Sequence, residues 1–207
     1  MKKILPAVGA SIVCMTCCAF SYFDVVVTNA LAHKSRIVQS DYMAYISQCA
    51  NQTTNTEMSL TARVLQGYSQ LAKFEMKMDE KSLAAAYLSA TNTLRGIGAP
   101  GCNWQYWQFQ LLHVACLNSE NKLSQAYLVA SNAWQAVQTS GFVDSTNCIS
   151  RALLKFEGMT DDSTVKDAVA ISLALTAYAS GHTNAVETVK SCLPVRLRSQ
   201  LTEFLEE

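Results

Sequence analysis

Cysteine is the residue type in this sequence with the clearest capacity for chemistry. Beyond residue 32, the chain of 207 residues carries five cysteines, an odd number that leaves at least one thiol unpaired. If the helices run alternately up and down, Cys49, Cys102 and Cys148 fall at helix ends or loops on one edge, and Cys116 and Cys192 towards the other. A disulfide requires Cα atoms within about 7 Å of each other. We therefore predict a Cys102–Cys148 disulfide, with Cys49–Cys102 as its rival and five unpaired thiols as the alternative.

No other set of residues has the spacing of a reaction centre. His113 and Cys116 lie three positions apart and could share a helix face, but a zinc site needs three or four ligands and no partner pair is evident. Paired carboxylates fall at expected turns or chain ends, where they solvate or cap helices; the pairs are Asp79 and Glu80, Asp161 and Asp162, and Glu206 and Glu207. We predict no catalytic, cofactor-binding or metal-binding residues, and a protein that is not an enzyme.

The charge of the chain argues against one large class of partner. Lys and Arg number 16, Asp and Glu number 16, and charged residues make up only 15% of the chain. A nucleic-acid-binding surface needs clustered Lys and Arg, and no stretch is strongly basic. We therefore expect no nucleic-acid partner.

An internal repeat indicates how the chain is built. Residues 86–92, Ala-Tyr-Leu-Ser-Ala-Thr-Asn, return forty positions later as Ala-Tyr-Leu-Val-Ala-Ser-Asn at 126–132, and ten residues are identical when 65–101 is aligned with 105–141. A period of about forty residues is typical of helical hairpins that bury a shared core by stacking. The repeated Ala and Tyr positions fall on the expected packing stripe, whereas the Asn positions do not. The pattern predicts an all-α fold.

Apolar periodicity and stop signals place the helices. About eight are expected after the N-terminal segment. They include helices over 30–49 and 56–78, one with Asn103 as its cap, and others over 144–156, 165–179, 183–192 and 194–205. The two helices that contain the repeated heptads extend to residues 97 and 137.

One part of the sequence carries a family resemblance. Residues 173–181, Leu-Ala-Leu-Thr-Ala-Tyr-Ala-Ser-Gly, are followed by Asn-Ala-Val-Glu at 184–187 and Leu-Pro at 193–194. This order of an apolar helix, a Gly turn, an Ala-led helix and a closing Pro resembles a tetratricopeptide repeat. The turn is one or two residues short, and the earlier units are nearer forty residues than the thirty-four of that family. The resemblance implies stacked antiparallel helical hairpins, a tetratricopeptide-like α-solenoid.

The N-terminus has the pattern of an export signal. Lys2 and Lys3 precede a run without charge from Ile4 to Phe23, and Ala-Phe-Ser at 19–21 and Ala-Leu-Ala at 30–32 both resemble cleavage sites. The run is also long enough for an uncleaved membrane anchor, and a cysteine at 17 or 18 raises the alternative of lipidation. We assign 1–32 to a signal peptide or membrane anchor and 33–207 to a single helical-repeat domain. The body of the protein is expected in the periplasm or cell envelope, in contact with the membrane only through its N-terminal segment.

A candidate binding surface follows from the repeat. Trp104 and Trp107 share a stripe with Leu111 and are expected in the core. Another face of the same helix carries polar and aromatic side chains, and their counterparts forty positions earlier would continue that face. The candidate residues are Tyr106, Gln110 and His113, with Gln66, Gln70 and Lys73. A neutral, polar and partly aromatic groove suits peptide recognition.

These observations favour an exported helical-repeat protein that acts as a protein-binding scaffold or accessory subunit. Two alternatives remain: a small all-α enzyme or ligand-binding domain, and a membrane-anchored structural subunit. A pocket lined by two or more titratable groups with perturbed pKa values would favour the enzyme, and a shallow groove without them would favour the binding protein.

Overall fold

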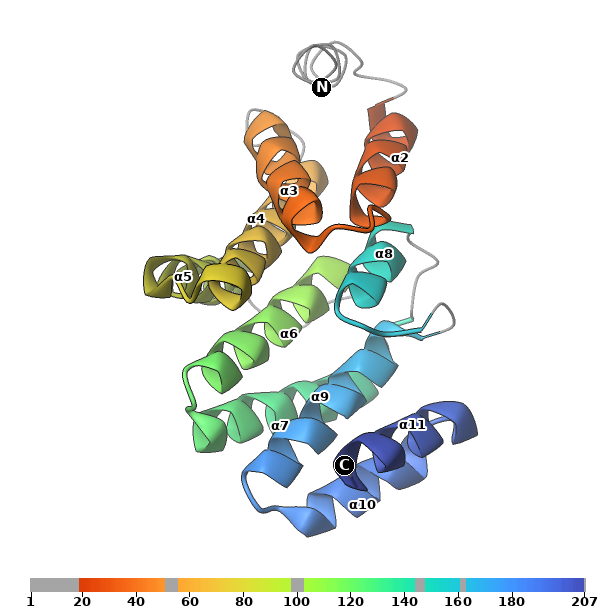
Figure 1. Ribbon diagram of the computed structural model, residues 1–207. Helices are drawn as coiled ribbons and strands as arrows, with labels where there is room; N and C mark the ends of the chain where they lie inside the picture. Colours follow the sequence, from red (N-terminus) through yellow and green to blue (C-terminus); the bar gives the residue numbers. More distant parts are fainter. Residues whose placement is uncertain (1–18, 51–55, 98–102, 144–147, 161–162, 207) are drawn as a thin grey trace.

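The described part of the chain is entirely helical between its turns. The computed structural model describes residues 19–50, 56–97, 103–143, 148–160 and 163–206, excepting the side chains of 19–24, 49 and 50 (Figure 1). These residues form ten helices and no strand, which confirms the all-α class. The helices are α2 (Ala19–Leu31), α3 (Arg36–Ala50), α4 (Thr56–Lys77), α5 (Glu80–Ile97), α6 (Trp104–Ser119), α7 (Leu123–Thr139), α8 (Cys148–Phe156), α9 (Val165–Ala179), α10 (Thr183–Cys192) and α11 (Val195–Glu206).

Two differences from the expected helices lie at the N-terminal end and at α8. The helix expected over 30–49 is divided, because the chain leaves α2 after Leu31 and enters α3 at Arg36. Between them the Nδ1 of His33 accepts a hydrogen bond from the Ser35 backbone N–H at 3.1 Å, which holds the turn. The helix expected from residue 144 is described only from Cys148. The prediction of about eight helices was therefore too low.

Several helix boundaries follow from the signals in the sequence. The side chain of Asn103 caps α6 by accepting a hydrogen bond from the Gln105 backbone N–H at 3.0 Å, as expected. Thr164 and Asp167 form a reciprocal capping box at the start of α9. Gly181 lies in the turn between α9 and α10 and has a φ of 81°, a conformation that favours glycine. α9 and α10 therefore have the predicted boundaries.

Helices that follow one another in sequence pack against each other. This holds from α2 to α7 and from α8 to α11, with the contacts of α8 with α9 and of α10 with α11 less extensive than that of α9 with α10. α7 packs against α9, which is not the next helix in the sequence. In addition α4 contacts α6, and α6 contacts α9. α8 lies beside α2 and contacts both α6 and α9, so α2 meets a distant part of the chain (Figure 1).

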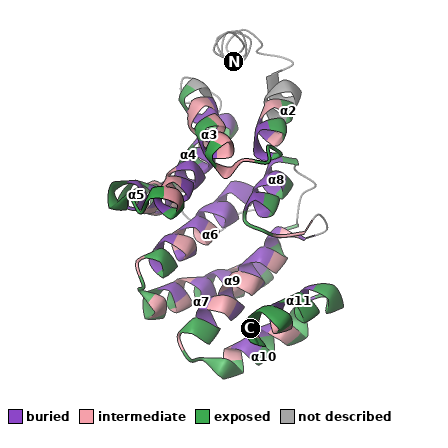
Figure 2. Ribbon diagram, in the orientation of Figure 1, coloured by how far each residue is buried: buried purple, intermediate pink, exposed green. Residues whose placement is uncertain are grey.

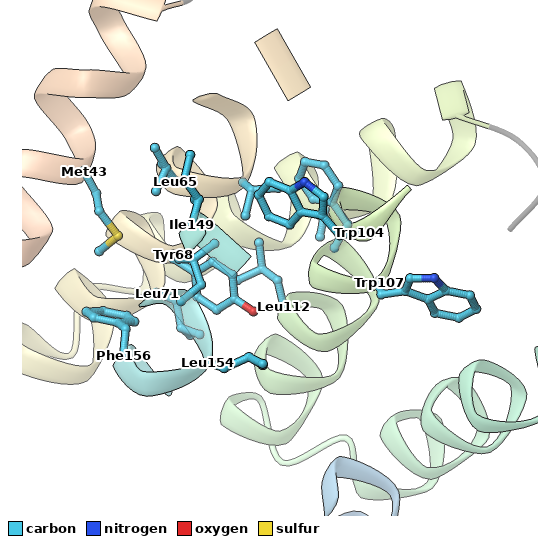
Figure 3. Packing of buried hydrophobic residues seen from close by; sticks show 14 of the residues in the cluster. Met43, Leu65, Tyr68, Leu71, Trp104, Trp107, Leu112, Ile149, Leu154 and Phe156 are labelled. Atoms are coloured by element: carbon cyan, nitrogen blue, oxygen red, sulfur yellow. The ribbon is translucent and has the colours of Figure 1, made fainter. Parts of the chain in front are cut away.

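The apolar core has two parts. The larger part extends from α2 to α9 and includes Tyr68 and Trp107, which are wholly buried (Figure 3). The smaller part joins residues of α6, α7 and α9 to α10 and α11. Tyr87 and Trp134 are partly buried and contact both. Figure 2 shows α6 buried over much of its surface, whereas the outer faces of α5, α10 and α11 are exposed.

The repeated heptads take the positions expected from their pattern. Ala86 and Ala126 are fully buried, and their neighbours Tyr87 and Tyr127 are half-buried. Asn92 and Asn132 are exposed. The repeat is therefore a packing motif on the second helix of two hairpins, α5 and α7.

None of the helices within the described residues combines the length and the hydropathy needed to cross a bilayer. The candidate anchor lies mostly in residues 1–18, outside those that the structure describes. Its last part, Ala19 to Phe23, belongs to α2.

Candidate functional site

The residues predicted to form a binding surface do not share one level of exposure. Tyr106 is only 7% exposed, and its hydroxyl accepts a hydrogen bond from Gln110 Nε2 at 2.9 Å. Its ring meets that of Trp107 edge to face, with centroids 4.9 Å apart. Tyr106, which was expected on a binding surface, is therefore buried, and its part in binding stays a prediction. α6 contacts α4, α5, α7, α8 and α9, so more than one of its faces is buried, whereas the helical spacing indicated a single stripe.

The other five residues of that set are less buried. His113 is half-buried and lies edge-on to Tyr87, with ring centroids 5.3 Å apart. Burial lowers the pKa of His113. Gln110, Gln70 and Lys73 are half-buried, and Gln66 alone of the six is exposed. Trp104 and Trp107, at 6% and 0% exposure, lie in the core as predicted.

The predicted disulfide cannot be placed within the described residues, because Cys102 lies outside them. Cys148, the first residue of α8, is an exposed free thiol. The rival pair also requires Cys102, so both pairs stay predictions. Cys116 is a buried free thiol, and burial, reinforced by the carboxylates of Glu120, Glu157 and Glu75, raises its pKa to about 12. Cys116 is therefore protonated and a poor nucleophile near neutral pH.

The described residues contain no group of three or more side chains that could hold a metal ion. His113 and Cys116 lie on the same helix, as their spacing required. Their surroundings differ. His113 contacts Tyr87 of α5, whereas three nearby carboxylates raise the pKa of the Cys116 thiol.

A recess of about 190 Å³ lies between α6, the end of α8 and α9. Its walls are mainly apolar, with polar groups from three residues. The lining residues are Leu111, Ala115 and Asn118 of α6; Leu154, Glu157 and Met159 at the end of α8; and Ala168, Ile171, Ser172 and Leu175 of α9. The spacings within α6 and α9 place their members on one face of each helix.

The end of α8 brings Glu157 into this recess. Gly158 adopts a φ of 86°, which favours glycine and turns the chain sharply. The Met159 backbone N–H then donates to the Leu154 carbonyl at 2.9 Å, and the Glu157 N–H donates to that of Leu153 at 3.0 Å. Glu157 and Met159 are thereby held on either side of the turn, facing α6 and α9.

Glu157 is the ionisable residue that lines the recess. The residue is exposed at one side of the recess, and desolvation by the protein packed beside it disfavours its charged form. This desolvation raises the pKa of Glu157 to about 7; the nearby Arg36 acts to lower it, and the carboxylate of Glu75 to raise it. Glu157 also follows the C-terminal end of α8, where the helix dipole disfavours an anion.

Arg36 is already engaged by other groups. Its guanidinium forms an ion pair with Glu75 at 3.0 Å, donates to the Phe156 carbonyl oxygen and lies 3.7 Å from the centroid of the Phe156 ring. Phe156 in turn packs edge to face with the buried Tyr68, with centroids 6.3 Å apart. Arg36 therefore anchors the end of α8 to α3 and α4.

Glu157 was not among the residues predicted from the sequence. A glutamate that precedes a glycine stop at a helix C-terminus is a weak signal, because the helix dipole makes that position unfavourable for a carboxylate. Nothing local in the sequence indicates that α8 packs against α6 and α9. The recess depends on that packing.

A second, larger cleft of about 400 Å³ lies between α2 and α8. Its lining is partly basic and includes the exposed thiol of Cys148. The lining residues are Thr28, Leu31 and Ala32 of α2 and the turn after it, and Cys148, Arg151, Ala152 and Lys155 of α8. One wall of this cleft comes from α2. That helix overlaps residues 1–32, the segment assigned to a signal peptide or membrane anchor.

Comparison with protein-family models, with curated proteins and with solved structures gave no match to this chain. Its function is therefore inferred from its own residues.

Proposed function

We propose that this protein is an exported helical-repeat protein that binds other proteins, as a scaffold or accessory subunit of the cell envelope. The order of helix contacts supports this. The pairs α4–α5, α6–α7 and α9–α10 pack as hairpins, and the first helices of successive pairs also contact each other, α4 with α6 and α6 with α9. Stacked tetratricopeptide-like hairpins have this order of contacts, and their first helices line a shared face.

The recess supports the proposal through the helices that form it. Its walls come from α6 and α9, the first helices of two successive pairs, and from the end of α8. An apolar recess beside polar side chains suits a partner's side chain, since pockets give peptide grooves their specificity. Its single ionisable lining residue suits binding better than general acid–base catalysis, in which a proton donor and acceptor are positioned together.

Peptide binding is tested by selecting linear peptides from a random displayed library on the purified protein. We expect enriched peptides to bind the wild type and to lose affinity for Ile171→Glu, which places a charge in the recess. Leu128→Glu is the matched control, because Leu128 is 60% exposed on α7. Enrichment of no peptide, or equal loss in both variants, would contradict the proposal.

The N-terminal segment supports the exported location. Two lysines before the uncharged run from Ile4 to Phe23 form the pattern of a signal or anchor. We expect Val13→Arg, a charge in the middle of that run, to retain the protein in the cytoplasm of a bacterial host, and the exposed Gln200→Arg on α11 to be exported. Fractionation that finds the wild type in the cytoplasm would contradict export.

A further inference from the structure

The size of the recess limits what can occupy it. A volume of about 190 Å³ lies below the roughly 300 Å³ at which pockets for drug-sized molecules usually begin. The walls supplied by Leu111, Leu154 and Ile171 are aliphatic. One aliphatic side chain of a bound peptide fits these dimensions better than a whole cofactor.

The charges around the recess are unevenly compensated. Glu75 is paired with Arg36 at 3.0 Å, and Glu120 with Lys122 at 2.8 Å. Within the described residues, the Glu157 carboxyl forms no ion pair or side-chain hydrogen bond. Arg36 acts on it through space but is held by Glu75 and Phe156. The recess therefore presents an apolar wall beside an acidic group whose complement is a cation.

We propose that the recess binds a peptide segment in which an aliphatic side chain adjoins a lysine or arginine, with Glu157 as the counter-ion of that cation. This rests on the proposed peptide-binding function and specifies the sequence that the site prefers. The aliphatic side chain fills the space between α6 and α9, while the cation reaches the carboxylate at the end of α8. Charge complementarity at a partly desolvated site favours such a partner over one with an acidic residue in the same place.

Binding through this pair depends on pH. The neighbouring titratable groups are Arg36 on α3, Glu75 on α4, the neutral Cys116 thiol on α6 and Glu120 at the end of α6. Lys122 pairs with Glu120, the α9 lining residues are not ionisable, and the pKa values of Tyr68 and Cys116 lie far above neutral. Because the pKa of Glu157 is about 7, its carboxyl group gains charge as the pH rises through that value. Affinity for the cationic peptide therefore increases over the same interval.

The test uses synthetic 12-residue peptides that differ only in a central pair: Leu-Lys, Leu-Gln, Leu-Glu or Ser-Lys. Affinities are measured at pH values about one unit below and above 7. We expect the wild type to bind Leu-Lys about fivefold more tightly than Leu-Gln at the higher pH, with a smaller ratio at the lower pH. Leu-Glu and Ser-Lys should both bind more weakly than Leu-Lys.

Two carboxylate-to-amide variants complete the test. Glu157→Gln should lose the preference for Leu-Lys over Leu-Gln and its pH dependence, and keep the preference for Leu over Ser. Glu187→Gln is the matched control on α10, where the Glu187 side chain is 74% exposed, and it should behave as the wild type. If Glu157→Gln still prefers Leu-Lys over Leu-Gln, Glu157 is not the counter-ion of the peptide's lysine. Binding that depends on Leu without any Lys preference overturns this inference alone, whereas no binding of any peptide overturns the proposed function as well.

Discussion

A hydrogen bond inside the core joins α4 to α6. The Tyr68 hydroxyl donates to Gln108 Oε1 at 2.9 Å, and both residues are 0% exposed. Gln108 Nε2 in turn reaches Ser150 Oγ of α8 at 3.5 Å. These buried polar groups satisfy one another across three helices, so removal of one leaves an acceptor without a partner.

We expect Tyr68→Phe to reduce the free energy of unfolding by about 1–2 kcal/mol, because Gln108 Oε1 then stays buried without its donor. Urea denaturation measures the change. Tyr178→Phe is the control, because Tyr178 is 52% exposed on α9 and should change the stability by less than about 0.5 kcal/mol. Equal effects in the two variants would show that the Tyr68 hydrogen bond does not stabilise the fold.

Glu157 should make the stability of the protein depend on pH. Its folded-state pKa of about 7 lies above the ordinary value of 4.5, so the folded state binds this proton more tightly than the unfolded state. The stabilisation is present below about pH 4.5 and is lost as the pH rises to about 7. In Glu157→Gln this contribution is absent.

Urea denaturation of wild type and Glu157→Gln from pH 4.5 to above 7 checks this expectation. The stability of the wild type relative to the variant should fall over that interval by on the order of 1 kcal/mol, since the side chain reaches solvent and its charge is partly screened. A constant difference between the two proteins at every pH would contradict the raised pKa.

At the scale of the helix, Gly67 marks a close approach between α4 and α6. A Cβ atom at this position would lie 2.3 Å from Leu112 Cδ2, and Leu112 is itself 0% exposed. An added methyl group must therefore displace a packed side chain. At Gly96 in α5, by contrast, no atom lies within 4 Å of such a Cβ.

The same substitution should have opposite effects at these two sites. Gly67→Ala is expected to destabilise the protein by about 1–3 kcal/mol through overpacking. Gly96→Ala should stabilise it by up to about 1 kcal/mol, because alanine is the better helix former. Thermal and urea denaturation of both variants show whether each substitution raises or lowers the stability. Stabilisation by Gly67→Ala would mean that Leu112 moves without strain.

α2 is integrated into the fold although it overlaps the segment assigned to a leader. Val27, Ala30 and Leu31 are at most 7% exposed, and Gln39 Nε2 of α3 donates to the Leu31 carbonyl oxygen at 2.5 Å. Cleavage after residue 21 would keep these contacts, whereas cleavage after residue 32 would remove them.

We expect a variant that begins at His33 to be destabilised by several kcal/mol relative to one that begins at Tyr22, because it loses three buried apolar side chains of about 1–3 kcal/mol each. Urea denaturation compares the two truncated proteins. Mass spectrometry of the native protein should find α2 in the mature chain. A mature N-terminus at His33 with unchanged stability would show that α2 is dispensable.

Sequence patterns predicted helices best where strong local signals bound them. The 3.6-residue periodicity and the Gly181 turn were sufficient for α9 and α10. The turn between α2 and α3, residues 32–35, contains neither Gly nor Pro. It is held by a hydrogen bond between Ser35 and His33. The burial of Tyr106 depends on how many helices surround α6, which is a property of the packing of the whole chain.

At the scale of the whole molecule, local sequence patterns predicted parts of the fold, whereas the site depends on contacts between distant segments. The forty-residue repeat predicted the packing positions of α5 and α7, because its alanines recur at helical spacing and are buried in both helices. The recess was not predictable, because it forms where α8 packs on α6 and α9. Glu157 has its altered pKa only through that non-local arrangement.

The two-part core predicts unequal stability along the chain. α11 is attached mainly through Leu197 and Leu201, which belong to the smaller cluster, whereas α4 and α6 contribute many residues to the larger one. Hydrogen exchange monitored by mass spectrometry should therefore show the amides of α11 exchanging before those of α4 and α6. Simultaneous exchange of all three helices would indicate a single cooperative unit.

The contact between α2 and α8 also sets an order of events during synthesis. Helices α3 to α7 find their neighbours in the adjacent stretch of chain, so each hairpin can form soon after it emerges. Of the described helices α2 emerges first, but its partner α8 begins only at Cys148. Until then α2 keeps part of its apolar surface unburied. This interval, set by the rate of elongation, is when a chaperone has the best access to α2.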